Sequence, residues 1–139
     1  MGVRKLLGII PAWVASTLCL VAILWLTLAP DPTGEIPVPL FPGADKLVHA
    51  IMFGGFSLCL CFDMSKKGSG FRKLSVAQLC FAAIISGLTG IIIEFLQREM
   101  GLGRSFEAAD MISDIAGAAV VSLIFGLCQS IKSNRTDIQ

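Results

Sequence analysis

The sequence has few charged residues and no excess of either sign. Only 15% of its 139 residues are Asp, Glu, Lys or Arg, and the formal net charge is +1. A nucleic-acid-binding protein needs a basic face that neutralises phosphates, whereas the Lys and Arg residues here fall in short segments between apolar runs. We therefore expect no nucleic-acid partner.

Histidine is scarce, and the cysteines cannot all be paired. The chain has one histidine, His49, and five cysteines, an odd number that cannot pair completely within one chain. Cys59 and Cys61 are separated by one residue, which is closer than ordinary zinc ligands. We expect no disulfide framework, no resident metal ion and no cofactor. The cysteines are expected to pack as small apolar side chains.

Apolar residues are abundant. They make up 55% of the chain and give it a mean hydropathy of +0.80. Their runs are long enough, at about 1.5 Å per helical residue, to cross a hydrocarbon core of about 30 Å. We predict a single domain over residues 1–139, an all-α membrane protein with four transmembrane helices at about 6–28, 45–64, 75–97 and 108–128. A cleaved signal peptide is the alternative for the first run, but the run is long and prolines follow it, so an uncleaved anchor is favoured.

The basic residues predict an orientation. Eight Lys and Arg residues fall on one side of the four runs and three on the other. By the positive-inside rule both termini and the linker between the second and third runs are cytoplasmic. The proline-rich loop over residues 30–43 and the loop over residues 98–106 then face outward. The cytoplasmic set is Arg4, Lys5, Lys66, Lys67, Arg72, Lys73, Lys132 and Arg135, and the outward set is Lys46, Arg98 and Arg104.

Ionisable residues that enter the apolar runs gather near one face of the bilayer, at the outward ends of the last three helices. A carboxylate at membrane depth costs about 2.5 to 3.5 kcal/mol, so these groups are expected to face one another, and glycines on the same helices permit close approach. The last three helices would then form a polar core, with the first as an apolar brace. The candidate polar site is Asp45, Lys46, His49, Glu94, Gln97, Arg104, Asp110 and Asp114.

Simpler roles are open for several of these residues. Asp45 and Asp110 also fit first-turn acids that complement a helix N-terminus. Arg104, like Arg98, also fits an interfacial residue, and Gln97 an interhelical hydrogen-bond partner. The strongest functional candidates lie a turn inside the apolar runs, where an ionisable residue is by default a functional hypothesis. They are His49, Glu94 and Asp114.

Three motifs in the last three helices resemble a known family. They read Asp45-Lys46-x-x-His49-x-x-x-Phe53, then Glu94-x-x-Gln97, then Gly103-Arg104-Ser-Phe-Glu-Ala-Ala-Asp110-x-x-x-Asp114-x-x-Gly117-Ala118. Together they are similar to the VanZ-like family of small bacterial integral membrane proteins, over about residues 45–127. The family more often has Asn at the position of Asp114. The resemblance implies a multi-pass protein of the bacterial cytoplasmic membrane, in a family linked to resistance to the glycopeptide teicoplanin, and it does not imply an enzyme.

Several functions fit this pattern. In the first, the site binds or processes an amphiphilic cell-envelope molecule at the extracytoplasmic face, with Lys46 and Arg104 holding an anionic head group such as that of a lipid or envelope precursor. In the alternative, the site is a buried polar network of a non-catalytic scaffold or partner-binding module. The third and least favoured of these functions is metal binding by His49 together with the carboxylates of Glu94, Asp110 and Asp114. An ordinary hydrolase is not indicated, because no nucleophile stands beside His49 in a recognisable order, and four runs without a visible repeat do not suggest a transporter.

Overall fold

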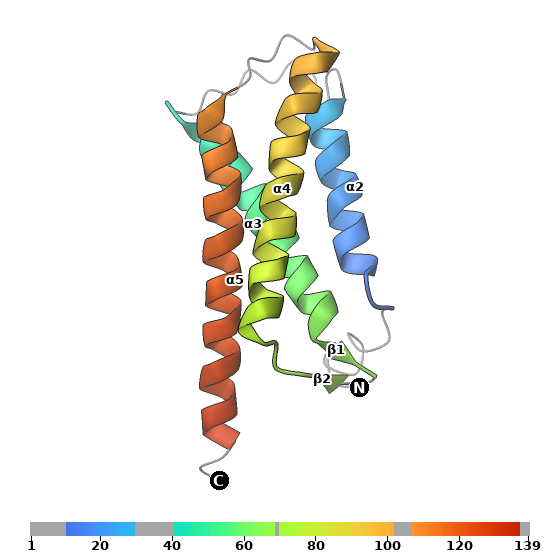
Figure 1. The fold of residues 1–139 in the computed structure, drawn as a ribbon, viewed down its shortest axis with the longest axis vertical. Coiled ribbons are helices and arrows are strands. Elements are labelled where there is room, and N and C mark those ends of the chain that lie inside the picture. Colours follow the sequence, from blue (N-terminus) through green and yellow to red (C-terminus); the bar gives the residue numbers. More distant parts are fainter. Residues whose placement is uncertain (1–10, 30–40, 69, 102–106, 137–139) are drawn as a thin grey trace.

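The computed structural model describes residues 11–29, 41–68, 70–101 and 107–136. Four helices run up and down beside one another: α2 (Val14–Leu28), α3 (Ala44–Ser65), α4 (Val76–Met100) and α5 (Ala108–Thr136) (Figure 1). A short hairpin in which β1 (Lys66–Lys67) pairs antiparallel with β2 (Gly70–Phe71) connects α3 to α4. The prediction of an all-helical protein is confirmed.

The closest helix packing joins α3 to α5. These two helices share the largest interface, followed by α4 with α5, whereas α2 packs mainly on α3 and less on α4. Gly117 of α5 permits the approach, because a Cβ at this position would come within 2.8 Å of the Cα and carbonyl carbon of Ala50. Small residues play this part in membrane helix pairs. Helix α2 lies at the side of the other three, as predicted for a brace, but its contacts are not purely apolar, because Ser16 and Thr27 are among its buried residues.

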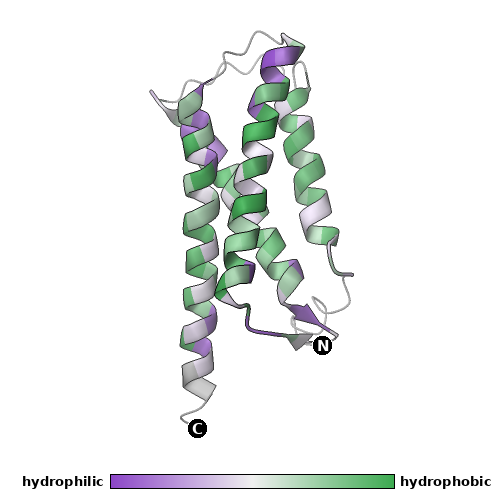
Figure 2. Ribbon diagram, viewed as in Figure 1, coloured by the Kyte–Doolittle hydropathy of each residue, from purple (hydrophilic) through white to green (hydrophobic). Residues whose placement is uncertain are grey.

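Several polar side chains lie between the helices beside a small apolar core, and many large apolar side chains face outward. The hydroxyls of Ser57 and Ser122 are 2.6 Å apart between α3 and α5, and Ser86 of α4 donates a 2.7 Å bond to the carbonyl of Phe53. In a soluble helix bundle polar side chains cover the outside, whereas here serines lie in the interior and large apolar side chains cover much of the outside. The outward faces of α4 and α5 are coloured largely as apolar in Figure 2 and carry Ile84, Leu88, Ile92, Phe95, Ile112, Val120, Leu123, Ile124 and Leu127.

Three of the described helices are long and apolar enough to cross a membrane. They are α3, α4 and residues Ala108–Ser133 of α5. Their apolar surfaces suit contact with lipid chains, and their buried serines suit a dry interior where every polar group needs a neighbour. The structure thus indicates a multi-pass membrane protein.

The first apolar run differs from its prediction. Helix α2 begins at Val14, and residues 11–13 form a turn in which Trp13 adopts a left-handed φ of 74°. A continuous helix over residues 6–28 is therefore wrong at residues 11–13, and residues 1–10 lie outside the described part. The 15 residues of α2 span about 22 Å, less than the hydrocarbon thickness of about 30 Å.

The other three helices include the predicted ranges almost completely and run beyond them. Helix α4 begins after a capping box between Ser75 and Gln78 and ends at Met100, where Gly101 takes the left-handed φ of 61° that glycine permits. Helix α5 runs to Thr136, past the predicted end at 128. The polar residues of this last stretch do not oppose a helix, so loss of hydropathy marks the end of the apolar run and not the end of the helix.

Candidate functional site

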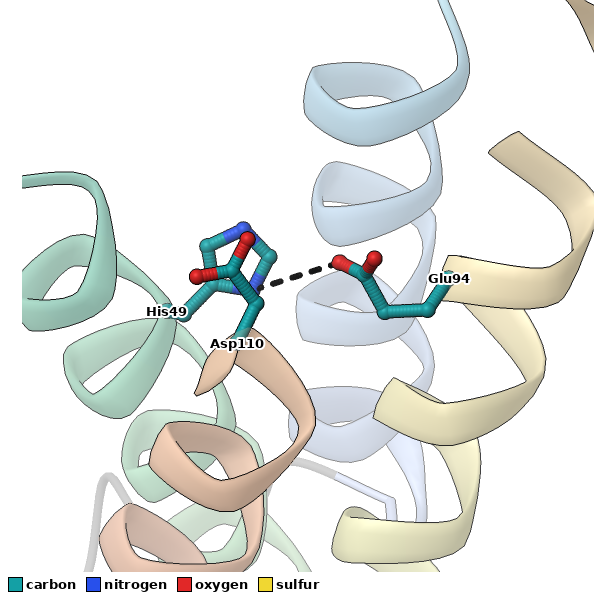
Figure 3. A group of neighbouring side chains, drawn as sticks. All are labelled: His49, Glu94 and Asp110. Atoms are coloured by element: carbon teal, nitrogen blue, oxygen red, sulfur yellow. Dashed lines mark ion pairs between the residues drawn. The ribbon is translucent and has the colours of Figure 1, made fainter. Parts of the chain in front are cut away.

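His49 is the centre of a group of buried charges between α3, α4 and α5. Its Nδ1 lies 3.0 Å from Oδ1 of Asp114. The same nitrogen lies 3.9 Å from Oε1 of Glu94, the pair that Figure 3 marks with a dashed line. The side chain of Asp114 is fully buried and that of Glu94 is 3% exposed, whereas 15% of the His49 side chain is exposed. The His49 side chain is thus partly exposed, whereas the two carboxylates beside it are buried.

The His49 ring packs against a side chain of its own helix. Phe53 lies four residues further along α3 on the same face, and the two rings stack with centroids 6.3 Å apart. Phe53 is itself fully buried, and its carbonyl accepts the hydrogen bond of Ser86 from α4. This packing and the bond to Asp114 together fix the position of the ring.

Asp114 depends on a glycine in the neighbouring helix. A Cβ at Gly90 of α4 would lie 2.8 Å from both Cβ and Cγ of Asp114. Gly90 is one turn before Glu94, so the missing side chain at this position makes room for the Asp114 carboxylate beside His49. Gly90 is therefore part of the site, although it carries no functional group.

Lys46 joins a second set of carboxylates at the beginning of α3 and α5. Its Nζ donates 2.7 Å bonds to Asp45 and to Glu107 and lies 3.4 Å from Oδ1 of Asp110. Asp110 connects the two sets, because one ligand atom from each of His49, Glu94 and Asp110 falls within 4.8 Å of the others. We call the whole group the polar cluster: Asp45, Lys46, His49, Glu94, Glu107, Asp110 and Asp114.

Six of the eight predicted site residues belong to this cluster. Asp45 is at its exposed edge, as a first-turn acid of α3 would be. Arg104 lies outside the described residues. Gln97 is buried but points elsewhere, because its Nε2 donates a 2.8 Å bond to the carbonyl of Thr27 in α2. The interpretation of Gln97 as an interhelical hydrogen-bond partner is confirmed.

Replacing Gln97 by leucine should loosen α2 and leave the polar cluster in place. Hydrogen bonds between membrane helices contribute about 0.6 to 2 kcal/mol, and the carbonyl of Thr27 belongs to the last turn of α2, where intrahelical donors end. We expect Gln97→Leu to lower the unfolding temperature in detergent by a few degrees. Glu99→Gln, an exposed change in the same turn of α4, is the control. An unchanged unfolding temperature in Gln97→Leu would contradict this role.

Sequence reasoning missed two acidic residues. Glu107 precedes α5 and bonds Lys46, although it enters the sequence analysis only as part of the third motif, with no role for its side chain. Asp63 is buried near the end of α3, at the opposite end of the bundle, where it pairs with Lys66 at 3.2 Å. The prediction that the buried ionisable residues gather at one end is therefore wrong for Asp63. Its spacing of three from Lys66, just past the end of a predicted helix, was the available signal.

The cluster has two chemical uses. An imidazole that is oriented by a carboxylate is suited to accept a proton from a bound molecule or to bind a metal ion with its other nitrogen. Three helices bring the donor atoms together, and 15% of the His49 side chain is exposed. In comparisons with known protein families, with curated proteins and with solved structures, the chain matches none of them.

Proposed function

We propose that the chain is a VanZ-like multi-pass membrane protein whose polar cluster binds the polar head group of an amphiphilic cell-envelope molecule at the extracytoplasmic face. The observation that carries the proposal is the His49–Asp114 pair, 3.0 Å apart, with Glu94 beside it. Charged groups at membrane depth are costly to keep, and here they surround a partly exposed imidazole instead of being sealed completely. The setting between helices favours a ligand with one polar end and one apolar end.

The apolar end of such a ligand has a place on the same helices. A groove of about 320 Å³ between α4 and α5 is lined by apolar residues, among them Gly87, Ile91 and Ile115. Ile115 follows Asp114 directly, and Ile91 is three residues before Glu94, so the groove begins within one helical turn of the cluster. A hydrocarbon chain in this groove would place its head group near the cluster.

The distribution of basic residues supports the proposed topology. Lys66, Lys67, Arg72 and Lys73 lie in or next to the β1–β2 hairpin, at the end of the bundle opposite the polar cluster (Figure 1). If the hairpin is cytoplasmic, the cluster faces outward. Four spans with both termini inside, and the bacterial cytoplasmic membrane as the location, belong to the same proposal. The VanZ-like assignment rests on the three motifs, several residues of which the bundle brings together.

Ligand retention in purified protein tests the proposal. Native mass spectrometry of the full chain in a mild detergent should detect a copurifying amphiphile on the wild type and on Glu99→Gln. We expect at least about a tenfold loss, equivalent to about 1.4 kcal/mol of binding free energy, in His49→Gln and Glu94→Gln. Arg104→Ala tests whether Arg104, the basic residue of the third motif, also helps to hold the ligand. Retention of the same molecules in every variant would contradict the proposal.

A structural role is the second candidate, and a particular observation favours it. Ser57 with Ser122, Ser86 with Phe53 and Gln97 with Thr27 show that this bundle uses buried hydrogen bonds to join its helices. If the cluster were one more such network, His49→Gln would lower the unfolding temperature without changing the copurifying molecules. Exchange of Glu94 and Arg104 in a double variant would then restore the stability that replacement of either residue alone lowers.

A further inference from the structure

The described part of the polar cluster has more carboxyl groups than basic ones. Its ion pairs between described residues go to Lys46 and to His49. Negative charge in a setting of low dielectric is costly unless a cation is close. A cation bound here would offset part of this negative charge. The five carboxyl groups are those of Asp45, Glu94, Glu107, Asp110 and Asp114.

The donor atoms at the centre lie close to the spacing of metal ligands. One atom each from His49, Glu94 and Asp110 lies within 4.8 Å of the other two, and the three residues come from α3, α4 and α5 (Figure 3). Metal–nitrogen and metal–oxygen bonds of about 2.0 to 2.2 Å put the ligand atoms about 3 to 4 Å apart. The three side chains are thus close enough to hold one ion after they adjust, and the ion would take Nε2 of His49, because Asp114 holds Nδ1.

A buried oxygen in this group has no hydrogen-bond donor among the described residues. Asp110 is 8% exposed, and its Oδ1 accepts no hydrogen bond there. Lys46 is 3.4 Å away, but its 2.7 Å bonds go to Asp45 and Glu107. A buried acceptor without a donor costs about 1 to 3 kcal/mol, and a charged one costs more. A bound cation would satisfy this oxygen.

Asp114 has the place of a supporting carboxylate. It lies 3.0 Å from Nδ1 of His49, and metal-binding histidines commonly direct one ring nitrogen to a carboxylate while the other binds the ion. Asp114 is fully buried, so this orientation is fixed from inside the bundle. The pair therefore has an explanation in which His49 is a ligand and Asp114 positions it.

We propose that His49, Glu94 and Asp110 bind a divalent transition-metal cation and that Asp114 positions His49. One imidazole with two carboxylates suits Mn²⁺, Fe²⁺ or Zn²⁺ better than Ca²⁺, which prefers oxygen ligands alone. This inference revises the expectation of no resident metal. The metal site itself does not depend on the proposed function. Only its role does, since the ion would let an acidic cluster hold an anionic head group.

Direct Mn²⁺ binding tests the site without any lipid ligand. The full chain, purified in detergent and stripped with a chelator, is titrated with Mn²⁺ while free Mn²⁺ is followed by electron paramagnetic resonance. We expect one ion per chain in the wild type and in Glu99→Gln. Affinity should fall at least about a hundredfold in Glu94→Gln and Asp110→Asn, and about 10- to 100-fold in Asp114→Asn.

The wild type also provides a test that does not depend on the folding of variants. Mn²⁺ should raise its unfolding temperature, because an ion that binds only the folded state stabilises that state. Helix content by circular dichroism identifies any variant that fails to fold. Wild-type protein that binds no Mn²⁺, or folded Glu94→Gln and Asp110→Asn that bind it with wild-type affinity, would overturn the proposal. If the chain binds Mn²⁺ but no amphiphile copurifies with it, the metal site is supported and only the proposed function is contradicted.

Discussion

Asp63→Ala is expected to lower the free energy of unfolding by about 3 to 5 kcal/mol, the cost of removing one partner from a buried ion pair. Asp63 accepts hydrogen bonds from the backbone N–H of Ser16 at 2.9 Å and from its hydroxyl at 2.7 Å. The same carboxylate pairs with Lys66, whose side chain is 6% exposed. Alanine would leave a buried ammonium without this carboxylate and would release the beginning of α2.

The position of Ser16 explains why α2 depends on Asp63. Ser16 is the third residue of α2, within the first turn, whose N–H groups have no intrahelical acceptor. Helices often meet this need with their own N-cap side chain, but Trp13 provides none. The carboxylate of a neighbouring helix does so here, and a negative charge at this end also complements the helix dipole.

Equilibrium unfolding in mixed micelles with an increasing share of denaturing detergent measures the effect of Asp63→Ala. Asp63→Asn keeps an acceptor for Ser16 and should lose less stability than the alanine variant. Lys67→Ala removes an exposed charge one residue from Lys66 and should stay within about 0.5 kcal/mol of the wild type. A loss in Asp63→Ala no larger than that of Lys67→Ala would show that the pair contributes nothing to stability.

The helices were predictable because apolar runs and breakers mark them clearly. Prolines precede α3, and Gly101 ends α4. The break at residues 11–13 was harder to predict, because Pro11 and Trp13 lie within an apolar run and hydropathy does not distinguish a turn from a helix there. The length of the apolar run alone thus predicted a longer helix than α2 is in the described part.

The polar cluster was predictable for a different reason. A spacing of four places Asp110 and Asp114 on one face, and the cost of charge at membrane depth makes such faces turn inward. Individual partners were not predictable in the same way. Gln97 shares a turn with Glu94, but a rotation of a few tens of degrees around α4 directs it to Thr27 of α2 and not to His49. Sequence spacing determines the face, and helix packing determines the partner.

Gly117→Ala is expected to separate α3 from α5 and to disrupt the site at the same time. A Cβ at position 117 would meet the backbone of Ala50, with the Cα and the carbonyl carbon both 2.8 Å away, and its carbonyl oxygen is closer still. Backbone atoms cannot move aside as a flexible side chain can, so the helices must separate. Overpacking of this kind costs about 1 to 3 kcal/mol, and we expect a value near the upper end.

Gly55→Ala is the matched control, because a Cβ at position 55 of α3 would have nothing within 4 Å among the described residues. Alanine also favours a helix over glycine by about 1 kcal/mol, so this variant should be as stable as the wild type or more stable. Unfolding of both variants in mixed micelles gives the comparison. Equal stability of Gly117→Ala and Gly55→Ala would contradict the close packing.

The same variant should also weaken cation binding, because Ala50 is the residue after His49. A shift of the α3 backbone away from α5 moves the imidazole away from Asp114 and Asp110, which both lie on α5. We expect Gly117→Ala to bind Mn²⁺ at least about tenfold more weakly, since supporting contacts of this kind affect metal affinity by about 10- to 100-fold. Gly55→Ala should bind it normally. A destabilised Gly117→Ala with unchanged Mn²⁺ affinity would mean that His49 keeps its ligand geometry without the close contact of α3 and α5.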